Sequence, residues 1–230
     1  MLESNNPMLH RLLLTLVVVV FLSGCATTGS NSAVDCIEKG IAYSRVGEFD
    51  LAFMEYNRAI EIDSWNAEAY NARGNISFIK GEYDKAVQDY KKAVKLNPDY
   101  AKAYSNLGFA YFEMSEFDRA LHSFTKAIKL NPEYAKAFNN RGLVYFAIGD
   151  YEHALKDYSR AISLAPELAK PYDNRGMIHM IIGDEDRACS DLVMACELGV
   201  CTTYEMAQEN GLCNDGLIAM NSCSHKRFLL

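Results

Sequence analysis

Pairs of a basic and an acidic residue recur 16 positions apart in this sequence, and such pairs could either transfer protons or hold two segments together. The pairs are Lys39 with Glu55, Arg73 with Asp89, Arg141 with Asp157, and Arg175 with Asp191. At one point in this series, between the second and third pairs, Leu107 stands at the place of the base and Ser123 at the place of the acid. Because base and acid are present or absent together, we predict structural ion pairs between two helices rather than a catalytic site.

The sequence contains no motif typical of an enzyme active site besides these base–acid pairs. The sequence contains no GxSxG, no HExxH and no glycine-rich phosphate loop. His122, His153 and His179 occupy unrelated positions, and five histidines with one tryptophan offer little material for a metal or haem site. A formal net charge of −7 argues against nucleic acid as a partner, because its binding proteins carry basic surfaces. We therefore expect a protein that is not an enzyme and holds no cofactor or metal.

The elements that must position these residues repeat every 34 residues. The spacing is kept by Gly40, Gly74, Gly108, Gly142 and Gly176, and by Ala52, Ala86, Ala120, Ala154 and Ala188. Within one copy, Phe138, Gly142 and Tyr145 share one stripe of a helix. A second helix follows the turn at Gly149 and ends before Pro166. We therefore predict pairs of helices whose small residues let the two backbones approach closely.

This pattern resembles the tetratricopeptide repeat, a helix–turn–helix unit that stacks into a right-handed superhelix. The resemblance implies an all-α fold, a right-handed α-solenoid of five repeats at 33–66, 67–100, 101–134, 135–168 and 169–200. Residues 201–213 are expected to add a cysteine-rich capping helix. Ser115 replaces the turn glycine of the third repeat, and Ser64 and Val200 stand where a proline belongs. Terminal repeats are commonly atypical because they cap the stack.

The resemblance also implies a ligand groove, lined by the first helix of each repeat. Counted from the first residue of the repeat, the residues that face this groove are the second, fifth, sixth, ninth and twelfth. These places hold Lys102, Lys136 and Lys170, the asparagines Asn71, Asn75, Asn106, Asn139, Asn140 and Asn174, and the apolar residues Phe78, Phe109, Phe112, Leu143, Phe146, Met177 and Met180. A side-chain amide both donates and accepts, so a row of amides can bind the backbone of an extended peptide while the apolar row takes its side chains. The row resembles the asparagine ladder in the superhelix of the nucleocytoplasmic glycosyltransferase that adds N-acetylglucosamine to serine and threonine.

The groove has a plainer alternative. Asparagine at the sixth and ninth places is common in tetratricopeptide repeats at large, and part of the apolar row could belong to the core. The carboxylate-clamp pattern of chaperone-binding members is not met, because no lysine or arginine holds the fifth or sixth place. This argues against a receptor for chaperone tails.

The first 25 residues are predicted to be a lipoprotein signal peptide. Arg11 precedes an apolar run, Leu12 to Leu22, that is too short to span a bilayer. The run ends in LSGC, which resembles the lipobox of bacterial lipoproteins and implies cleavage before Cys25 and a lipid anchor on it. The alternative is an ordinary signal peptide with a chance cysteine. Residues 26–32 would form a flexible tether, and the absence of aspartate after Cys25 resembles the outer-membrane sorting rule, which implies a protein facing the periplasm.

The remaining cysteines are predicted to form disulfides, because an exported protein meets an oxidising compartment and no CxxC pair supports a metal site. Cys189 and Cys196 are seven residues apart, about 10 Å along a helix, and cannot bond each other. If a last helix folds back on the fifth repeat, Cys201 returns beside Cys196 and Cys213 reaches Cys189. We therefore predict the bridges Cys196–Cys201 and Cys189–Cys213, with Cys36 as a buried free thiol.

The sequence as a whole favours a membrane-anchored, non-catalytic adaptor of the cell envelope that binds an extended segment of another protein. An assembly factor for a pilus or a secretion machine, and a structural homo-oligomer, are alternatives, and an enzyme is the competing class. Residues 214–230 show no periodicity and are predicted to be a mobile tail.

Overall fold

The computed structural model describes residues 32–213, and within this range every regular element is an α-helix. Cys25, the rest of the predicted signal peptide and tether up to residue 31, and the predicted tail at 214–230 lie outside the described residues. The described helices fall into two compact units that divide between Ala103 and Tyr104. None of the helices between residues 32 and 213 has the length and hydropathy needed to cross a bilayer.

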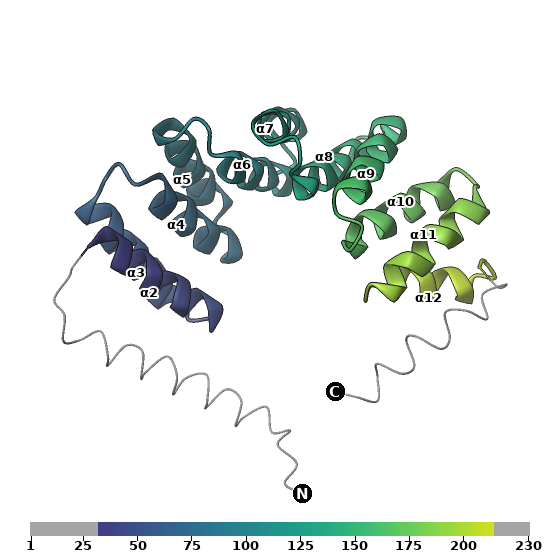
Figure 1. Ribbon diagram of the computed structural model, residues 1–230, viewed down its shortest axis with the longest axis horizontal. Coiled ribbons are helices and arrows are strands. Elements are labelled where there is room, and N and C mark those ends of the chain that lie inside the picture. The colour runs from purple at the N-terminus through teal and green to yellow at the C-terminus, as the bar shows by residue number, and fades with distance from the viewer. Residues whose placement is uncertain (1–31, 214–230) are drawn as a thin grey trace, which may run out of the picture. The chain divides into compact units, whose positions relative to one another are not determined.

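The first unit contains two pairs of consecutive helices, and a short turn joins the helices of each pair (Figure 1). Helix α2 (Ala33–Arg45) packs against α3 (Phe49–Ile62), and α4 (Ala67–Ile79) packs against α5 (Tyr83–Leu96). Helix α3 also contacts α4, so the two pairs stack in chain order. These pairs correspond to the first two predicted repeats.

The second unit continues the same pattern and ends in a single helix. Its elements are α6 (Ala101–Glu113, whose first residues up to Ala103 belong to the first unit), α7 (Phe117–Leu130), α8 (Ala135–Ala147), α9 (Tyr151–Leu164), α10 (Ala169–Ile181), α11 (Glu185–Glu197) and α12 (Thr202–Glu209). Helix α7 contacts α8, α9 contacts α10, and α12 packs on α11. The predicted all-α fold of consecutive helix–turn–helix pairs is confirmed in the part of the chain that the structure describes.

Local sequence explains where several helices begin and turn. Ser32 caps α2 by accepting a hydrogen bond from the Asp35 backbone at 3.1 Å, and the Asp35 carboxylate accepts one from the Ser32 backbone at 3.2 Å. Asn66 caps α4 in the same way, accepting from the Ala69 backbone at 2.9 Å. Ser115 adopts a φ of 58°, the left-handed conformation that favours glycine, and so takes the turn position that Gly149 occupies at 80° in the next repeat.

The core depends on small residues facing large ones. A Cβ atom added to Gly142 would lie 2.7 Å from Cε1 of Tyr158, which is too close for an unmoved ring. Ala154 and Tyr158 are both fully buried. The close approach of helices predicted from the recurring glycines and alanines is therefore present, and a leucine at Ala154 should destabilise the protein by about 1–3 kcal/mol.

Candidate functional site

Three of the four predicted base–acid pairs form two-bond ion pairs between the helices of one repeat. Nε and Nη2 of each arginine donate to the two carboxylate oxygens of the partner aspartate. The distances are 2.8 and 2.6 Å for Arg73–Asp89, 2.7 and 2.8 Å for Arg141–Asp157, and 2.7 Å twice for Arg175–Asp191. The aspartates are buried. Hydrogen bonding to the aspartate raises the pKa of each arginine, so these pairs stay charged and act as structural ties.

Each of these arginines also reaches the preceding repeat, a contact that the sequence analysis did not predict. The third nitrogen, Nη1, donates to Asn57 Oδ1 from Arg73, to Thr125 Oγ1 from Arg141, and to Ser159 Oγ from Arg175, over 2.7, 3.2 and 2.9 Å. The sequence contained a pattern from which this contact could have been predicted, because the acceptors stand 16 residues before each arginine and are all short and polar. One guanidinium thus joins three helices.

The fourth predicted pair is wrong. No ion pair joins Lys39 to Glu55 among the described residues, and Glu55 Oε2 is buried without a hydrogen-bond partner. A lysine offers one flexible ammonium instead of a planar fork, which explains why it does not reproduce the two-bond geometry. The thiol of Cys36 is buried and free, and burial together with the charge of Glu55 raises its pKa.

Four of the predicted groove residues meet in a pocket of about 220 Å³ in the second unit. The pocket lies between α8 and the start of α10 and is lined by Lys136, Asn139, Asn140, Leu168, Ala169, Lys170 and Pro171. Lys136 and Lys170 are exposed, and neither forms an ion pair within the described range. No carboxylate lines the pocket, so its two ammonium groups give it a positive potential.

The amides of this region bond mainly to one another. Asn174 Nδ2 donates to Asn139 Oδ1 at 3.0 Å, and Asn139 Nδ2 donates to Asn140 Oδ1 at 3.2 Å. Asn139 and Asn174 are buried, as is Asn71 in the first unit. Asn139, at the fifth place of α8, thus pairs with Asn174, at the sixth place of α10, the first helix of the next repeat. Ligand contact by these three buried amides stays a prediction. Asn140 remains partly exposed at the pocket.

The apolar row is shared between core and surface. In three repeats the aromatic at the twelfth place packs on the first residue of the second helix: Phe78 on Tyr83, Phe112 on Phe117, and Phe146 on Tyr151, with ring centroids 5.2, 6.0 and 5.9 Å apart. Phe109 stacks on Phe112 at 6.1 Å. Leu143, Met177 and Met180 are partly exposed. Phe78, Phe112 and Phe146 are themselves partly exposed, so the twelfth place contacts the second helix of its repeat and also reaches the surface.

The other predicted groove residues do not join this pocket. Asn75 in the first unit accepts a hydrogen bond from the Tyr90 hydroxyl at 2.8 Å. Lys102 is exposed at the start of α6, and Asn106 is partly exposed further along the same helix.

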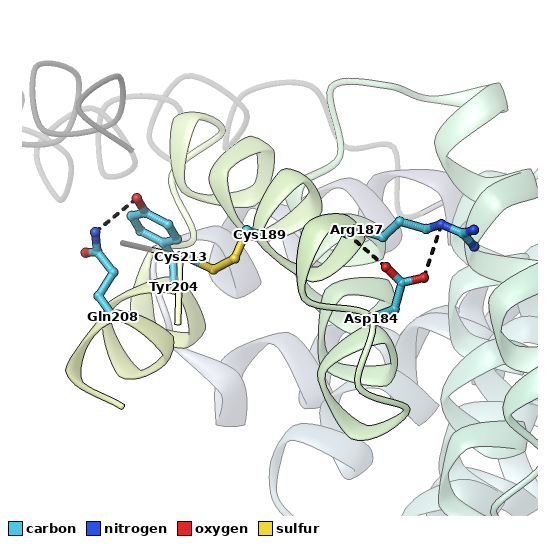
Figure 2. The surroundings of a disulfide bond; sticks show 6 residues. All are labelled: Asp184, Arg187, Cys189, Tyr204, Gln208 and Cys213. Atoms are coloured by element: carbon cyan, nitrogen blue, oxygen red, sulfur yellow. Dashed lines mark hydrogen bonds and ion pairs between the residues drawn. A yellow bond between two sulfur atoms is a disulfide. The ribbon is translucent and has the colours of Figure 1, made fainter. Parts of the chain in front are cut away.

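Two disulfides join α11 to the residues on either side of α12. Disulfides connect Cys189 with Cys213 and Cys196 with Cys201, which are the pairs that the sequence analysis predicted. Figure 2 shows Cys189 reaching Cys213 beside Tyr204 of α12, whose hydroxyl accepts a hydrogen bond from Gln208 at 3.1 Å. Tyr204 is buried against the end of α11.

A family profile described as "Tetratricopeptide repeat" matches residues 101–134 and 135–168, and one described as "TPR repeat" matches residues 74–115. A solved structure, the first TPR of Spaghetti (RPAP3) bound to HSP90 peptide SRMEEVD, is 31% identical, and the match covers 53% of this chain and 96% of that chain with a TM-score of 0.51. The chain belongs to the tetratricopeptide repeat (TPR) family.

Other TPR structures extend the likeness over more of the chain. MamA is 29% identical with a TM-score of 0.61, over 74% of this chain and 96% of its own. YrrB, a TPR protein with an unusual peptide-binding site, is 22% identical with a TM-score of 0.60, over 79% of this chain and 94% of its own, and that likeness shows the fold alone. No curated protein sequence matches the chain.

Proposed function

We propose that this protein is a membrane-anchored adaptor of the cell envelope that binds an extended, acidic segment of another protein in the pocket between α8 and α10. TPR proteins are generally non-catalytic scaffolds, and the TPR fold suggests protein–protein interaction. The RPAP3 relative binds a peptide that carries acidic residues. We take the ligand class, an acidic peptide, from that relative and not its particular sequence.

One observation carries the proposal: the pocket brings two unpaired lysines beside a partly exposed amide. Lys136 and Lys170 provide ammonium donors on either side, and Asn140 can accept from and donate to a peptide backbone. An acidic side chain between two lysines gains charge-assisted hydrogen bonds. The arrangement therefore favours a ligand with at least one carboxylate and an extended backbone.

The anchoring part of the proposal rests on Cys25 and the apolar run before it. The two disulfides of the last repeat support export, because disulfides persist in oxidising compartments and are rare in the cytosol. Two or three acyl chains on Cys25 would hold the protein stably on the periplasmic face of the outer membrane. We expect wild-type protein to sediment with membranes and to incorporate labelled palmitate. The Cys25→Ala variant should do neither, and a variant that stays lipidated would contradict the proposal.

Peptide selection from a displayed random library tests the ligand class. We expect wild-type protein to enrich peptides rich in aspartate and glutamate. A triple variant, Lys136→Gln with Asn140→Ala and Lys170→Gln, should bind the enriched peptides at least about tenfold more weakly. Asn139 and Asn174 are left intact because they bond to each other in the interior.

The matched control removes two lysines elsewhere in the same unit, Lys126→Gln with Lys129→Gln on α7. This variant should bind the enriched peptides as the wild type does. Selection of peptides without acidic residues, or equal loss of binding in both variants, would overturn the proposed ligand class.

A further inference from the structure

A second pocket of about 520 Å³ lies in the same unit, between α8 and α9. Its lining includes Phe138, Arg141, Tyr145, His153, Lys156 and Arg160. The α8 residues of this pocket lie on the opposite side of the helix from Lys136 and Asn140, as 3.6 residues per turn require. The pocket is thus separate from the proposed peptide site.

Two positive charges in this pocket are not compensated. Asp157 is the carboxylate of the lining, and it is fully engaged by Arg141, whose third nitrogen bonds Thr125. Lys156 is exposed and forms no ion pair within the described residues. Arg160 is exposed, and its guanidinium donates to the Ser163 hydroxyl at 3.5 Å and forms no ion pair with any residue that the structure describes. Summed over Arg141, Asp157, Lys156 and Arg160, the pocket carries a net charge of about +2.

Aromatic rings hold the two arginines of the pocket in place. The guanidinium carbon of Arg160 lies 6.0 Å from the centroid of Phe138, and that of Arg141 lies 5.7 Å from Phe138 and 5.9 Å from Tyr145. Contacts of this kind reduce the freedom of an arginine while leaving its N–H groups available. Arg160 is therefore positioned to donate into the pocket.

The next repeat supplies an internal comparison. A pocket of about 340 Å³ lies 34 residues further along and keeps the ion pair between Arg175 and Asp191. There Ser190 stands at the place of Lys156, and Met194 stands at the place of Arg160. The place of Arg160 is also basic in the first three repeats, at Arg58, Lys92 and Lys126, whereas the place of Lys156 is taken there by Met54, Gln88 and His122. Among the five repeats, the fourth alone carries a lysine or arginine at both places. This concentration of positive charge in one repeat points to a ligand.

We propose that the pocket between α8 and α9 binds a phosphate monoester. Such a group carries about −1.5 to −2 charge at neutral pH, which matches the uncompensated charge, and arginine with lysine is a common phosphate-binding set. A volume of about 520 Å³ falls in the range of small-molecule sites, so the pocket has room for more than the phosphate alone. The rings of Phe138 and Tyr145 would contact the organic part. A soluble phosphate ester and a lipid headgroup share this chemistry.

Binding measurements on the full chain with Cys25→Ala, which removes the lipidation site, separate the two sources. Calorimetric titration with glycerol 3-phosphate probes a soluble ester, with glycerol as the uncharged control. Sedimentation with phosphatidylcholine vesicles, with and without phosphatidic acid, probes a lipid headgroup. We expect saturable binding in at least one arm, and the arm that binds identifies the source.

Substitution of the two free cations locates the binding. Lys156→Gln with Arg160→Gln should weaken it at least about tenfold, and Arg160→Lys, which keeps the charge without the planar fork, should have an intermediate effect. The control, Lys126→Gln with Lys129→Gln on α7, should change binding less than about twofold. The proposal is overturned by no saturable binding in either arm, by equal binding of glycerol or of phosphatidylcholine alone, or by an equal loss in the control.

Discussion

The hydroxyl of Tyr90 donates a hydrogen bond to Oδ1 of Asn75 over 2.8 Å, from the second helix of a repeat to its first helix. Two repeats later Tyr158 is buried at the matching position, and its hydroxyl has no hydrogen-bond partner among the described residues. Leu143 stands there at the place of Asn75. Burial raises the pKa of both tyrosines, so both hydroxyls remain protonated donors at neutral pH. The same side chain is thus satisfied in one repeat and unsatisfied in another.

This difference predicts opposite effects of one substitution. Tyr90→Phe removes a hydrogen bond and should lower the free energy of unfolding by about 0.5–1.5 kcal/mol. Tyr158→Phe removes a buried donor that has no acceptor and should leave stability unchanged or raise it by up to about 1 kcal/mol. Urea unfolding followed by far-UV circular dichroism measures both variants. Equal losses in the two variants would show that Tyr158 has an acceptor.

The ion pair between Arg141 and Asp157 predicts a non-additive pair of substitutions. The two side chains are 18% and 6% exposed, so Asp157→Ser leaves a largely buried guanidinium without its carboxylate. We expect that single variant to lose about 3 kcal/mol of unfolding free energy. The double variant Arg141→Leu with Asp157→Ser reproduces Leu107 and Ser123 of the third repeat and should lose less than Asp157→Ser alone. A double variant as unstable as the sum of the two single variants would contradict this coupling.

The repeats could be predicted from the sequence because their signals are local. Helices α4, α8 and α10 begin at Ala67, Ala135 and Ala169, the first residues of three predicted repeats. Periodicity places a residue on a helix face without knowledge of its neighbours. The start of each of these helices could therefore be predicted from its own repeat, without information about the neighbouring repeats.

The candidate site could be predicted only in part because it depends on contacts between repeats. Whether Asn139 faces a ligand or the interior is decided by Asn174, 35 residues away, which donates to it. The third partner of Arg141 likewise lies in the preceding repeat, at Thr125. Periodicity could place Lys136 and Lys170 at equivalent positions, but only the structure brings them to one pocket.

Removal of either disulfide is predicted to destabilise α12, and by different amounts. The loop closed by Cys189 and Cys213 spans 24 residues and that closed by Cys196 and Cys201 spans five, so chain entropy assigns them about 3 and about 2 kcal/mol. We expect Cys189→Ser with Cys213→Ser to speed amide hydrogen exchange in α12 more than Cys196→Ser with Cys201→Ser does. Exchange in α8 and α9 serves as the control and should not change. Unchanged exchange in α12 after the first double substitution would show that α12 is held by packing alone.

His179 predicts a loss of stability on mild acidification. Burial lowers its pKa below the usual 6.5, and Arg175 and Arg187 act in the same direction, while Asp191 and Asp184 oppose them. Because the unfolded chain then binds the proton more readily than the folded chain, stability falls as the pH drops below about 6.5. The ring also has a buried Nδ1 without a hydrogen-bond partner among the described residues, so charging it gains no compensating bond.

The variant His179→Phe removes this titration while keeping an aromatic ring of similar size. Tyrosines occupy the same repeat position at Tyr43, Tyr111 and Tyr145, so the site accepts an aromatic side chain. We expect the unfolding free energy of wild-type protein to decrease more steeply than that of the variant between about pH 7 and about pH 5. His153→Gln is the matched control, because His153 is exposed and is not enclosed by the core. Parallel curves for wild type and His179→Phe would mean that the acid sensitivity resides in other groups, since the proton taken up on unfolding would not belong to His179.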